Sequence, residues 1–344
     1  MKAMVLEEIS DLKENPEPLK LKDLPVPQPG PNQILGKVLA CGVCHTELDE
    51  IEGRRQPRLP IIPGHEVVMR VKKLGSEANK FKIGDRVGIA WINSACGNCH
   101  FCQKGNENLC DQFQGTGCDA DGGYAEYTLV SENFAYLIPE RFTDLEAAPL
   151  LCAGAIGWRA LKLTGMEDGE TLGLYGFGAS AHIVIQVVKY KYPNSKVFVF
   201  TRKKGDEQSK LAEKLGADWT GVTGEEPPEK LNQAIDTTPV WGPPVEALKV
   251  LEKGGRLVMN LIRKEDWDKE EALGKIEYST HLWQEKEIKT VANIARKDVQ
   301  EFLPLAAEIP IRPEITEFKL EEANQALISL KQGKYRGAGV LRIA

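Results

Sequence analysis

The pattern of hydrophobic and polar positions changes near residue 150. Before that point, short apolar and β-prone runs, such as residues 34–40, are separated by glycine and proline. The first 35 residues indicate one strand and then a connection with four prolines between Pro25 and Pro31, which disfavour central strands and helices. The pattern therefore predicts a β-rich region that extends to about residue 150.

After residue 150, apolar runs of strand length alternate with segments of helical period. Helices are expected at about 150–163, 179–190 and 206–215, and short apolar strands at 171–175 and 197–200. Further buried strands are expected at 234–236, 256–261 and 288–292. The tail, about 293–344, is expected to hold helices near 298–307 and 321–331 and a final strand at 339–343. Strand–helix alternation at this spacing predicts an α/β fold with a doubly wound parallel sheet.

Length and composition narrow the class of protein. A chain of 344 residues is too long for one ordinary core, so two domains are expected. The net charge of −6 argues against nucleic acid as a partner. The start has no apolar signal segment and no stretch reaches eighteen apolar residues, so we expect a cytoplasmic protein without a membrane span. In that compartment, eight cysteines favour metal sites over disulfides.

Four cysteines occur within fifteen residues, in the spacing C-x2-C-x2-C-x7-C. They are Cys96, Cys99, Cys102 and Cys110. A two-residue gap lets neighbouring thiolates turn back onto one ion, and four thiolates make a closed tetrahedral zinc site. Disulfides or chance are the alternatives, and an iron–sulfur cluster is a weaker one because its common bacterial spacing ends C-x3-C-P. The spacing favours structural zinc.

A glycine-rich turn joins the expected strand 171–175 to the next helix. In Gly176-x-Gly178-x-x-Ala181, the first glycine permits a tight turn and the second lets the backbone approach a pyrophosphate. Ala181 allows close packing of helix on strand, and the N-terminus of the helix then faces the anion. A plain glycine-rich turn is the alternative. With a strand before it and a second strand–helix unit after it, the motif predicts a dinucleotide-binding loop.

The end of the second strand of this region predicts the choice of cofactor. Enzymes that use NAD usually place a carboxylate there, on the adenosine ribose. Here the strand ends Thr201-Arg202-Lys203-Lys204, with no carboxylate and three cations. This suits the 2′-phosphate of NADP(H), while NAD(H) remains possible if the cations belong to a solvated loop.

Cys44, His65 and Cys152 form a second candidate metal set, although they are far apart in sequence. A Cys-His-Cys set gives zinc three protein ligands and leaves its fourth position open. Each residue alone has another interpretation, since Cys152 suits a core thiol and His65 a hydrogen-bonded core histidine. Their occurrence together with a dinucleotide loop and a four-cysteine cluster favours the metal site.

With these motifs, the sequence resembles the zinc-dependent medium-chain alcohol dehydrogenases. The matching stretches follow the family's order over most of the chain. They are Gly42-Val43-Cys44-His45-Thr46, Gly64-His65-Glu66, Gly84-Asp85-Arg86-Val87, the four-cysteine cluster, Gly122-Gly123-Tyr124-Ala125-Glu126-Tyr127, Cys152-Ala153-Gly154 and the Gly176 loop.

The resemblance implies roles for individual residues. Cys44, His65 and Cys152 would hold a catalytic zinc, and the four-cysteine cluster would hold a structural one, which makes two zinc ions per chain. Glu66 would lie behind the metal, and Glu47 would orient the ligand histidine. Thr46 would accept the alcohol proton and His45 would contact the cofactor pyrophosphate. Cys41 and Cys118 would be spare.

Several positions depart from the family pattern. The histidine that often ends the family's proton relay is replaced by Asp49, so protons would leave through Asp49 or directly to solvent. Met69 stands where glycine is usual. Ala338 stands where the family often has an arginine for the pyrophosphate, so Arg336 or Lys334 would substitute for it.

The resemblance implies a β-rich GroES-like catalytic domain, residues 1–153 and 294–344, and a Rossmann cofactor domain, residues 154–293. The expected function is hydride transfer between a nicotinamide cofactor and a small alcohol or aldehyde, with the site in the cleft between the domains. A homodimer or homotetramer is expected. The alternatives are a zinc-free quinone or enone reductase of the same fold and a non-catalytic zinc- and nucleotide-binding scaffold.

Overall fold

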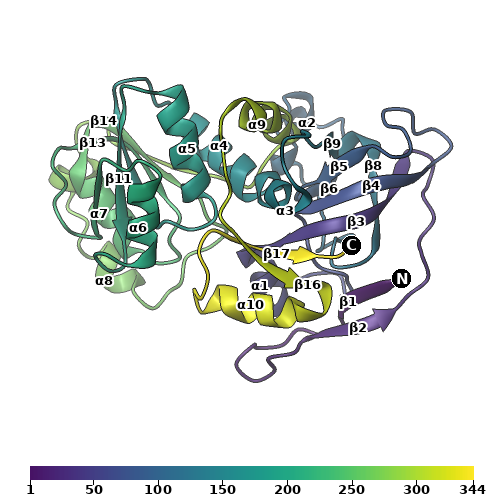
Figure 1. The fold of residues 1–344 in the computed structure, drawn as a ribbon. Coiled ribbons are helices and arrows are strands. Elements are labelled where there is room, and N and C mark those ends of the chain that lie inside the picture. The colour runs from purple at the N-terminus through teal and green to yellow at the C-terminus, as the bar shows by residue number, and fades with distance from the viewer. The chain divides into compact units, whose positions relative to one another are not determined.

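The computed structural model describes all residues from 1 to 344 and divides them into two compact units (Figure 1). Unit 1 comprises Met1–Ala155, Ile294–Ala307 and Pro313–Ala344, and unit 2 comprises Ile156–Asn293 and Glu308–Arg312. The sequence predicts divisions at 153/154 and 293/294, and it does not indicate the short return of the chain to unit 2 after residue 307.

Unit 1 is built on a seven-stranded sheet in which the neighbours run β16-β17-β3-β4-β5-β9 and β8 also pairs with β3. Only β16 and β17 pair in parallel, and the other pairs are antiparallel. The strands are β3 (Gln33–Val43), β4 (Val67–Leu74), β5 (Arg86–Ile89), β8 (Tyr127–Ser131), β9 (Ala135–Leu137), β16 (Ile315–Lys319) and β17 (Ala338–Arg342). This sheet is the β-rich domain that the sequence predicts.

The register of the β3–β4 pair positions part of the candidate site. Cys41 of β3 lies opposite Val67 of β4 in antiparallel pairing. The residue that follows the end of β3, Cys44, and the residue two before the start of β4, His65, therefore come to the same end of the sheet.

Smaller elements surround this sheet. Two two-stranded sheets pair β1 (Lys2–Leu6) with β2 (Leu19–Asp23) and β6 (Ile92–Ser94) with β7 (Gln114–Gly115). The helices are α1 (His45–Ile51), α2 (His100–Gln103), η1 (Glu107–Leu109), η2 (Glu132–Phe134), α3 (Asp144–Ala147), η3 (Ala148–Leu151), α9 (Arg296–Glu308), η5 (Leu320–Glu322) and α10 (Ala323–Lys331). The sequence predicts one strand in the first 35 residues, whereas the chain forms the β1–β2 pair and the start of β3 there.

Unit 2 is a six-stranded sheet with the order β12-β11-β10-β13-β14-β15, and every pair is parallel. The strands are β10 (Thr171–Tyr175), β11 (Lys196–Thr201), β12 (Trp219–Val222), β13 (Leu231–Asp236), β14 (Leu251–Met259) and β15 (Glu287–Thr290). The helices are α5 (Ala181–Lys191), α6 (Glu207–Lys214), α7 (Gly242–Val250), α8 (Lys269–Leu273) and the π-helix η4 (Tyr278–Leu282), while α4 (Ala153–Thr164) enters from unit 1. This order is that of the doubly wound dinucleotide-binding fold, as the sequence predicts.

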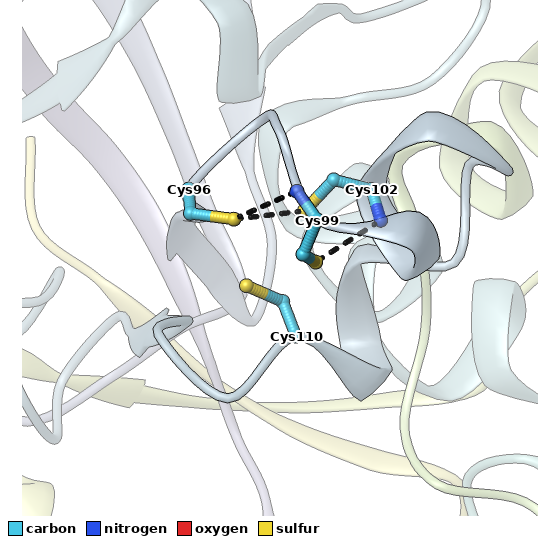
Figure 2. Close-up of side chains that lie close together, drawn as sticks. All are labelled: Cys96, Cys99, Cys102 and Cys110. Atoms are coloured by element: carbon cyan, nitrogen blue, oxygen red, sulfur yellow. Dashed lines mark hydrogen bonds between the residues drawn. The ribbon is translucent and has the colours of Figure 1, made fainter.

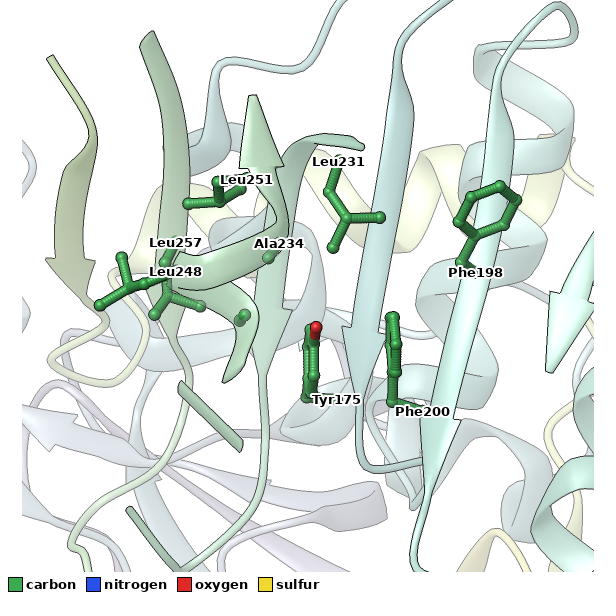
Figure 3. Packing of buried hydrophobic residues seen from close by; sticks show 9 residues of the cluster. Tyr175, Phe198, Phe200, Leu231, Ala234, Leu248, Leu251 and Leu257 are labelled. Carbon is green, nitrogen blue, oxygen red and sulfur yellow. The ribbon is translucent and has the colours of Figure 1, made fainter. Parts of the chain in front are cut away.

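Aromatic and aliphatic side chains pack together on one face of this sheet (Figure 3). The rings of Tyr175 and Phe200 stack at 4.1 Å, and Trp219 packs edge-on against Phe200 at 5.1 Å. Tyr175 ends β10 directly before Gly176. The core thus fixes the strand from which the glycine-rich turn begins.

Two local expectations from the sequence are wrong. Residues 288–292 were expected as a buried strand, but β15 covers Glu287–Thr290 and all four of its residues are exposed, with Ile288 48% exposed. Its place at the edge of the sheet explains this exposure. The helix expected at 150–163 is interrupted at Cys152, where φ is −125° and ψ is −72°, and α4 begins at the next residue.

None of the helices combines the length and the apolar composition needed to cross a membrane.

Candidate functional site

Four sulfur atoms of the cysteine cluster converge in one lobe of unit 1 (Figure 2). The Sγ atoms of Cys96, Cys99, Cys102 and Cys110 all lie within 4.8 Å of one another. Cys99 caps α2 and its sulfur accepts a hydrogen bond from the Cys102 N–H at 3.5 Å, and the Cys96 sulfur accepts from the Cys99 N–H at 3.4 Å. These backbone donors stabilise thiolates, as at other Cys-x2-Cys metal sites.

The charges in the lobe fit a bound divalent cation. The N–H groups of Cys99 and Asn98 lower the pKa of Cys96 to about 6, whereas burial raises the pKa of Cys102 to about 12. Four thiolates would repel one another without a positive ion between them. The four-sulfur set therefore fits a closed zinc site, whose binding releases the remaining thiol protons.

The lobe is tied to α9 by polar contacts. Glu107, buried in η1, accepts hydrogen bonds from Arg296 at 2.8 Å, and Asn106 accepts from Lys297 at 3.2 Å. The Arg296 guanidinium also lies over the Phe134 ring. The lobe and α9 thus hold each other within unit 1.

A second set of ligand-type atoms converges elsewhere in unit 1. The sulfurs of Cys44 and Cys152, a ring nitrogen of His65 and a carboxylate oxygen of Glu66 all lie within 4.8 Å of one another. Cys44 follows β3, His65 precedes β4, and Cys152 lies at the break between η3 and α4. The structure therefore brings together the three residues that the sequence proposes as ligands of a catalytic zinc.

Glu47 orients two of these residues. One of its carboxylate oxygens accepts a hydrogen bond from the Cys44 N–H at 2.8 Å, and the other lies 2.6 Å from Nδ1 of His65. Burial alone would lower the pKa of His65, but the charges and hydrogen bonds of Glu47 and Cys44 together outweigh burial, so the pKa is raised well above its usual value. Nε2 of His65 is buried and has no hydrogen-bond partner, as expected for a nitrogen that serves as a metal ligand.

The remaining groups also favour a cation. A hydrogen bond from the Cys152 thiol lowers the pKa of Cys44 well below its usual value and correspondingly raises that of Cys152. Burial, together with the Cys44 charge, raises the pKa of Glu66 well above its usual value. A Cβ at Gly42 would collide with the Glu66 carboxylate, so glycine is required to admit it. The three residues Cys44, His65 and Cys152 fit zinc with a fourth position open to a substrate oxygen or to the Glu66 carboxylate.

The proposed proton-transfer residues lie on α1. The hydroxyl of Thr46 is buried and lies 3.7 Å from the Cys44 sulfur. Asp49 is also buried, and its carboxylate accepts a hydrogen bond from Arg54 at 2.6 Å. His45, the first residue of the helix, is exposed.

An aromatic residue and a cation that no sequence motif indicates lie beside His65. Trp91 packs edge-on against His65 at 5.2 Å, and the Arg55 guanidinium lies 4.7 Å from the Trp91 ring centre. Arg55 also donates a hydrogen bond to the Cys118 sulfur at 3.2 Å. No local sequence motif connects these residues, because the contacts join segments far apart in the chain.

In unit 2, the glycine-rich turn leaves its backbone open. Gly176 has φ +81°, and a Cβ there would lie 2.8 Å from the Thr237 hydroxyl. A Cβ at Gly178 would meet no atom within 4 Å, so this backbone faces open space. Ala181 is buried at the start of α5. The turn thus fits a cradle for an anion at a helix N-terminus.

The end of β11 presents two unpaired cations. Thr201 is buried, and its hydroxyl donates to the Lys203 carbonyl at 3.0 Å and lies 3.0 Å from the Ser209 hydroxyl. Arg202 and Lys203 are exposed and form no ion pair, whereas Lys204 pairs with Glu225 at 2.9 Å. No carboxylate occupies the position after the strand. In unit 1, Arg336 lies 3.6 Å from Glu314.

Comparison with known proteins agrees with this class of metal- and dinucleotide-binding fold. Residues 30–140 match the model of the alcohol dehydrogenase GroES-like domain. The chain is 42% identical over 332 residues to the probable alcohol dehydrogenase AdhA of Mycobacterium tuberculosis, a match that covers 95% of this chain and 93% of the relative. It is 33% identical over 361 residues to the NAD-dependent alcohol dehydrogenase of Sulfolobus acidocaldarius, with both chains fully covered.

The fold of the chain also matches that of a solved alcohol dehydrogenase structure. The alcohol dehydrogenase of Aeropyrum pernix superposes with a TM-score of 0.86 at 25% identity, covering 99% of this chain and all of that one. The chain therefore belongs to the zinc-dependent medium-chain alcohol dehydrogenase family, as the sequence analysis inferred. This family consists of oxidoreductases that act on alcohols and aldehydes.

Proposed function

We propose that the protein is a zinc-dependent alcohol dehydrogenase or aldehyde reductase that transfers hydride between a nicotinamide cofactor and a small alcohol or aldehyde. The observation that carries this proposal is the convergence of Cys44, His65 and Cys152, with Glu47 orienting the histidine. A Cys-His-Cys set leaves one zinc position open for a substrate oxygen, whereas the four-cysteine lobe is closed and serves stability. The presence of all three proposed zinc ligands argues against a zinc-free enone or quinone reductase.

When bound, the zinc would supply Lewis-acid polarisation of the substrate oxygen, and the cofactor would accept or donate the hydride. The protein's own residues would hold the metal and move the proton. Glu47 and the buried Glu66 support the ligands. Thr46 is the proposed acceptor of the alcohol proton, supported by its place beside the Cys44 sulfur.

The sequence leaves two routes for the proton beyond Thr46, through Asp49 or directly to solvent. Asp49 is engaged by Arg54 at 2.6 Å. A charge-assisted hydrogen bond to a guanidinium already occupies one oxygen of this carboxylate. We therefore favour the direct route over a relay through Asp49.

NADP(H) is the proposed cofactor, although the Sulfolobus relative is named as NAD-dependent. The support is the absence of a carboxylate after Thr201 and the two exposed, unpaired cations Arg202 and Lys203. The guanidinium and ammonium groups suit a 2′-phosphate. Gly176, Gly178 and Ala181 would receive the pyrophosphate. His45 and Arg336 are proposed as further phosphate contacts. To reach a phosphate, Arg336 would have to leave its ion pair with Glu314.

The decisive experiment combines metal analysis with turnover. Purified protein should contain two zinc ions per chain and reduce simple aldehydes with NADPH. A chelator should abolish turnover, and added zinc should restore it. Protein that binds NADPH tightly but turns over no alcohol or aldehyde, with zinc present, would instead be the non-catalytic scaffold.

We also propose a homo-oligomer and a cytoplasmic location. Strand β15 ends the sheet, so its outer backbone edge is unpaired, and Ile288 within it is exposed. Tyr278 and Trp283, at the start of η4 and directly after it, are exposed as well. Such an edge suits antiparallel pairing with a second copy. Light scattering after size exclusion should give a dimer or tetramer, and Ile288→Lys should shift it toward monomer. None of the eight cysteines forms a disulfide, which suits a reducing compartment.

A further inference from the structure

Asn260 is the residue that directly follows β14, at the carboxyl edge of the unit 2 sheet. It is 7% exposed, and its backbone N–H donates to the Asp236 carbonyl at 2.8 Å. Ligands of doubly wound sheets bind at the carboxyl ends of the strands. Asn260 is therefore a buried polar residue at the edge where a ligand is expected.

The side-chain amide of Asn260 is only half satisfied. Its Nδ2 lies 3.4 Å from the Ser180 hydroxyl, in the turn that leads from Gly176 into α5. Its Oδ1 is buried and has no hydrogen-bond partner in the protein. Exchanging the amide N and O would still leave one of the two atoms unpartnered. Such an atom is costly unless a bound molecule satisfies it.

The order of the strands indicates which half of a dinucleotide would lie near Asn260. The pyrophosphate is expected at the Gly176 turn, after β10, and the adenosine ribose at the end of β11. β11 and β14 lie on opposite sides of β10 in the order β12-β11-β10-β13-β14-β15. The nicotinamide half therefore extends from the turn over the ends of β13 and β14, toward Asn260.

A buried ion pair fixes this part of the edge. Lys264 pairs with Asp236 at 2.5 Å and also donates to the carbonyls of Thr238 and Val240 at 2.8 and 2.7 Å. The Thr237 hydroxyl donates to the Tyr175 carbonyl at 3.0 Å, directly before the glycine-rich turn. Because Asn260 is bonded to Asp236 and Ser180, its amide is held in place between these segments.

We propose that Asn260 is a cofactor-binding residue whose side-chain amide accepts a hydrogen bond from the nicotinamide half of the cofactor. The donor is an N–H of the carboxamide or an O–H of the adjoining ribose. This proposal rests on the proposed function, because it requires a nicotinamide cofactor at the Gly176 turn. It adds a contact that no sequence motif of the turn contains.

The test is equilibrium binding, which requires no turnover. Fluorescence titration of NADPH and NADH should show Asn260→Ala binding both about tenfold more weakly than the unmodified protein. The fragments 2′,5′-ADP and ADP, which lack the nicotinamide half, should bind equally to both proteins. Asn194→Ala is the matched control, because Asn194 is exposed in the turn before β11, at the opposite edge of the sheet, and should change nothing.

Two further measurements identify the hydrogen-bond donor of the cofactor and test the effect of a charge at residue 260. The 3-acetylpyridine analogue of the cofactor lacks the carboxamide N–H2. If the carboxamide is the donor, Asn260→Ala should not weaken binding of this analogue, and if the ribose is the donor, the tenfold loss should remain. Asn260→Asp places a negative charge near the ring and should shift binding toward the positively charged oxidised cofactor over the reduced one.

Two outcomes overturn the proposal. One is unchanged affinity of Asn260→Ala for NADPH and NADH. The other is an equal loss for dinucleotide and fragment together with a lower Tm, which marks a purely structural residue. Failure of the proposed function looks different: without a cofactor site the unmodified protein binds neither dinucleotide, and a non-catalytic scaffold binds NADPH but turns over no alcohol or aldehyde.

Discussion

At the scale of single residues, proton transfer in the proposed reaction depends on Thr46. Its buried hydroxyl lies 3.7 Å from the Cys44 sulfur. Thr46→Ala should lower kcat by roughly 10²-fold or more, the usual contribution of a positioned acid–base group. Thr46→Ser keeps the hydroxyl and should retain most of the activity, while cofactor affinity stays unchanged in both variants. Full activity of Thr46→Ala across pH would contradict the assignment.

Arg202 is the residue on which the proposed preference for NADP(H) depends. Arg202→Ala should weaken NADPH binding by one to two decades, because a charge-assisted hydrogen bond contributes roughly 1.5–3 kcal/mol. NADH binding should not change. Lys204→Ala is the matched control, since Lys204 is engaged by Glu225 and should matter little. A larger kcat/KM with NADH than with NADPH would refute the preference.

The sequence indicates the residues whose chemistry follows from local spacing and misses those whose contacts are tertiary. The Cys-x2-Cys runs and the Gly176 turn are local patterns, so their geometry could be expected. No spacing relates Cys44, His65 and Cys152, so the sequence indicates them only by their occurrence together with those motifs and by the family resemblance. Arg55 and Asn260 could not be predicted, because only the folded chain brings Arg55 to Trp91 and Asn260 to Ser180.

At the scale of elements, hydrophobic period predicts strands and helices but not their places in a sheet. The apolar run that contains Ile288 suggests a buried strand, yet β15 is an exposed edge because nothing pairs with its outer side. The helix expected through Cys152 is interrupted at that residue, where the thiol joins the candidate metal site. The sequence does predict the parallel sheet of unit 2, because strands that alternate with helices form this kind of sheet.

The four-cysteine lobe should behave as a structural element with a stabilising metal. Cys99→Ser should remove one zinc ion per chain and lower the free energy of unfolding by more than about 3 kcal/mol, which for a unit of this size lowers Tm by roughly 6–12 °C. The lobe's contacts with α9 through Glu107 and Arg296 would spread the loss across unit 1.

The control for this prediction is His100→Ala, which changes an exposed residue inside the lobe but no ligand. It should keep two zinc ions and an unchanged Tm. A Cys99→Ser variant with two zinc ions and the parent Tm would show that the four sulfurs do not hold a metal.

At the scale of the whole molecule, the candidate metal sites and the proposed dinucleotide turn belong to different units. All ligand-type residues of both metal sets belong to unit 1, while the Gly176 turn and the cations after β11 belong to unit 2. Each unit has its own sheet, and the dinucleotide turn is built entirely from unit 2 residues. Loss of the catalytic metal should therefore leave cofactor binding intact.

Cys152→Ala tests this division, because it removes a proposed zinc ligand at the boundary of unit 1. The zinc content should fall from two ions to one per chain, and turnover should be lost because two ligands cannot hold the catalytic ion. NADPH affinity, measured by fluorescence titration, should equal that of the unmodified protein. Cys41→Ala removes an equally buried sulfur outside both metal sets and should retain both zinc ions and turnover. Retained turnover in Cys152→Ala would show that Cys152 is not a required zinc ligand. Loss of NADPH binding in this variant would show that cofactor binding depends on the catalytic metal site.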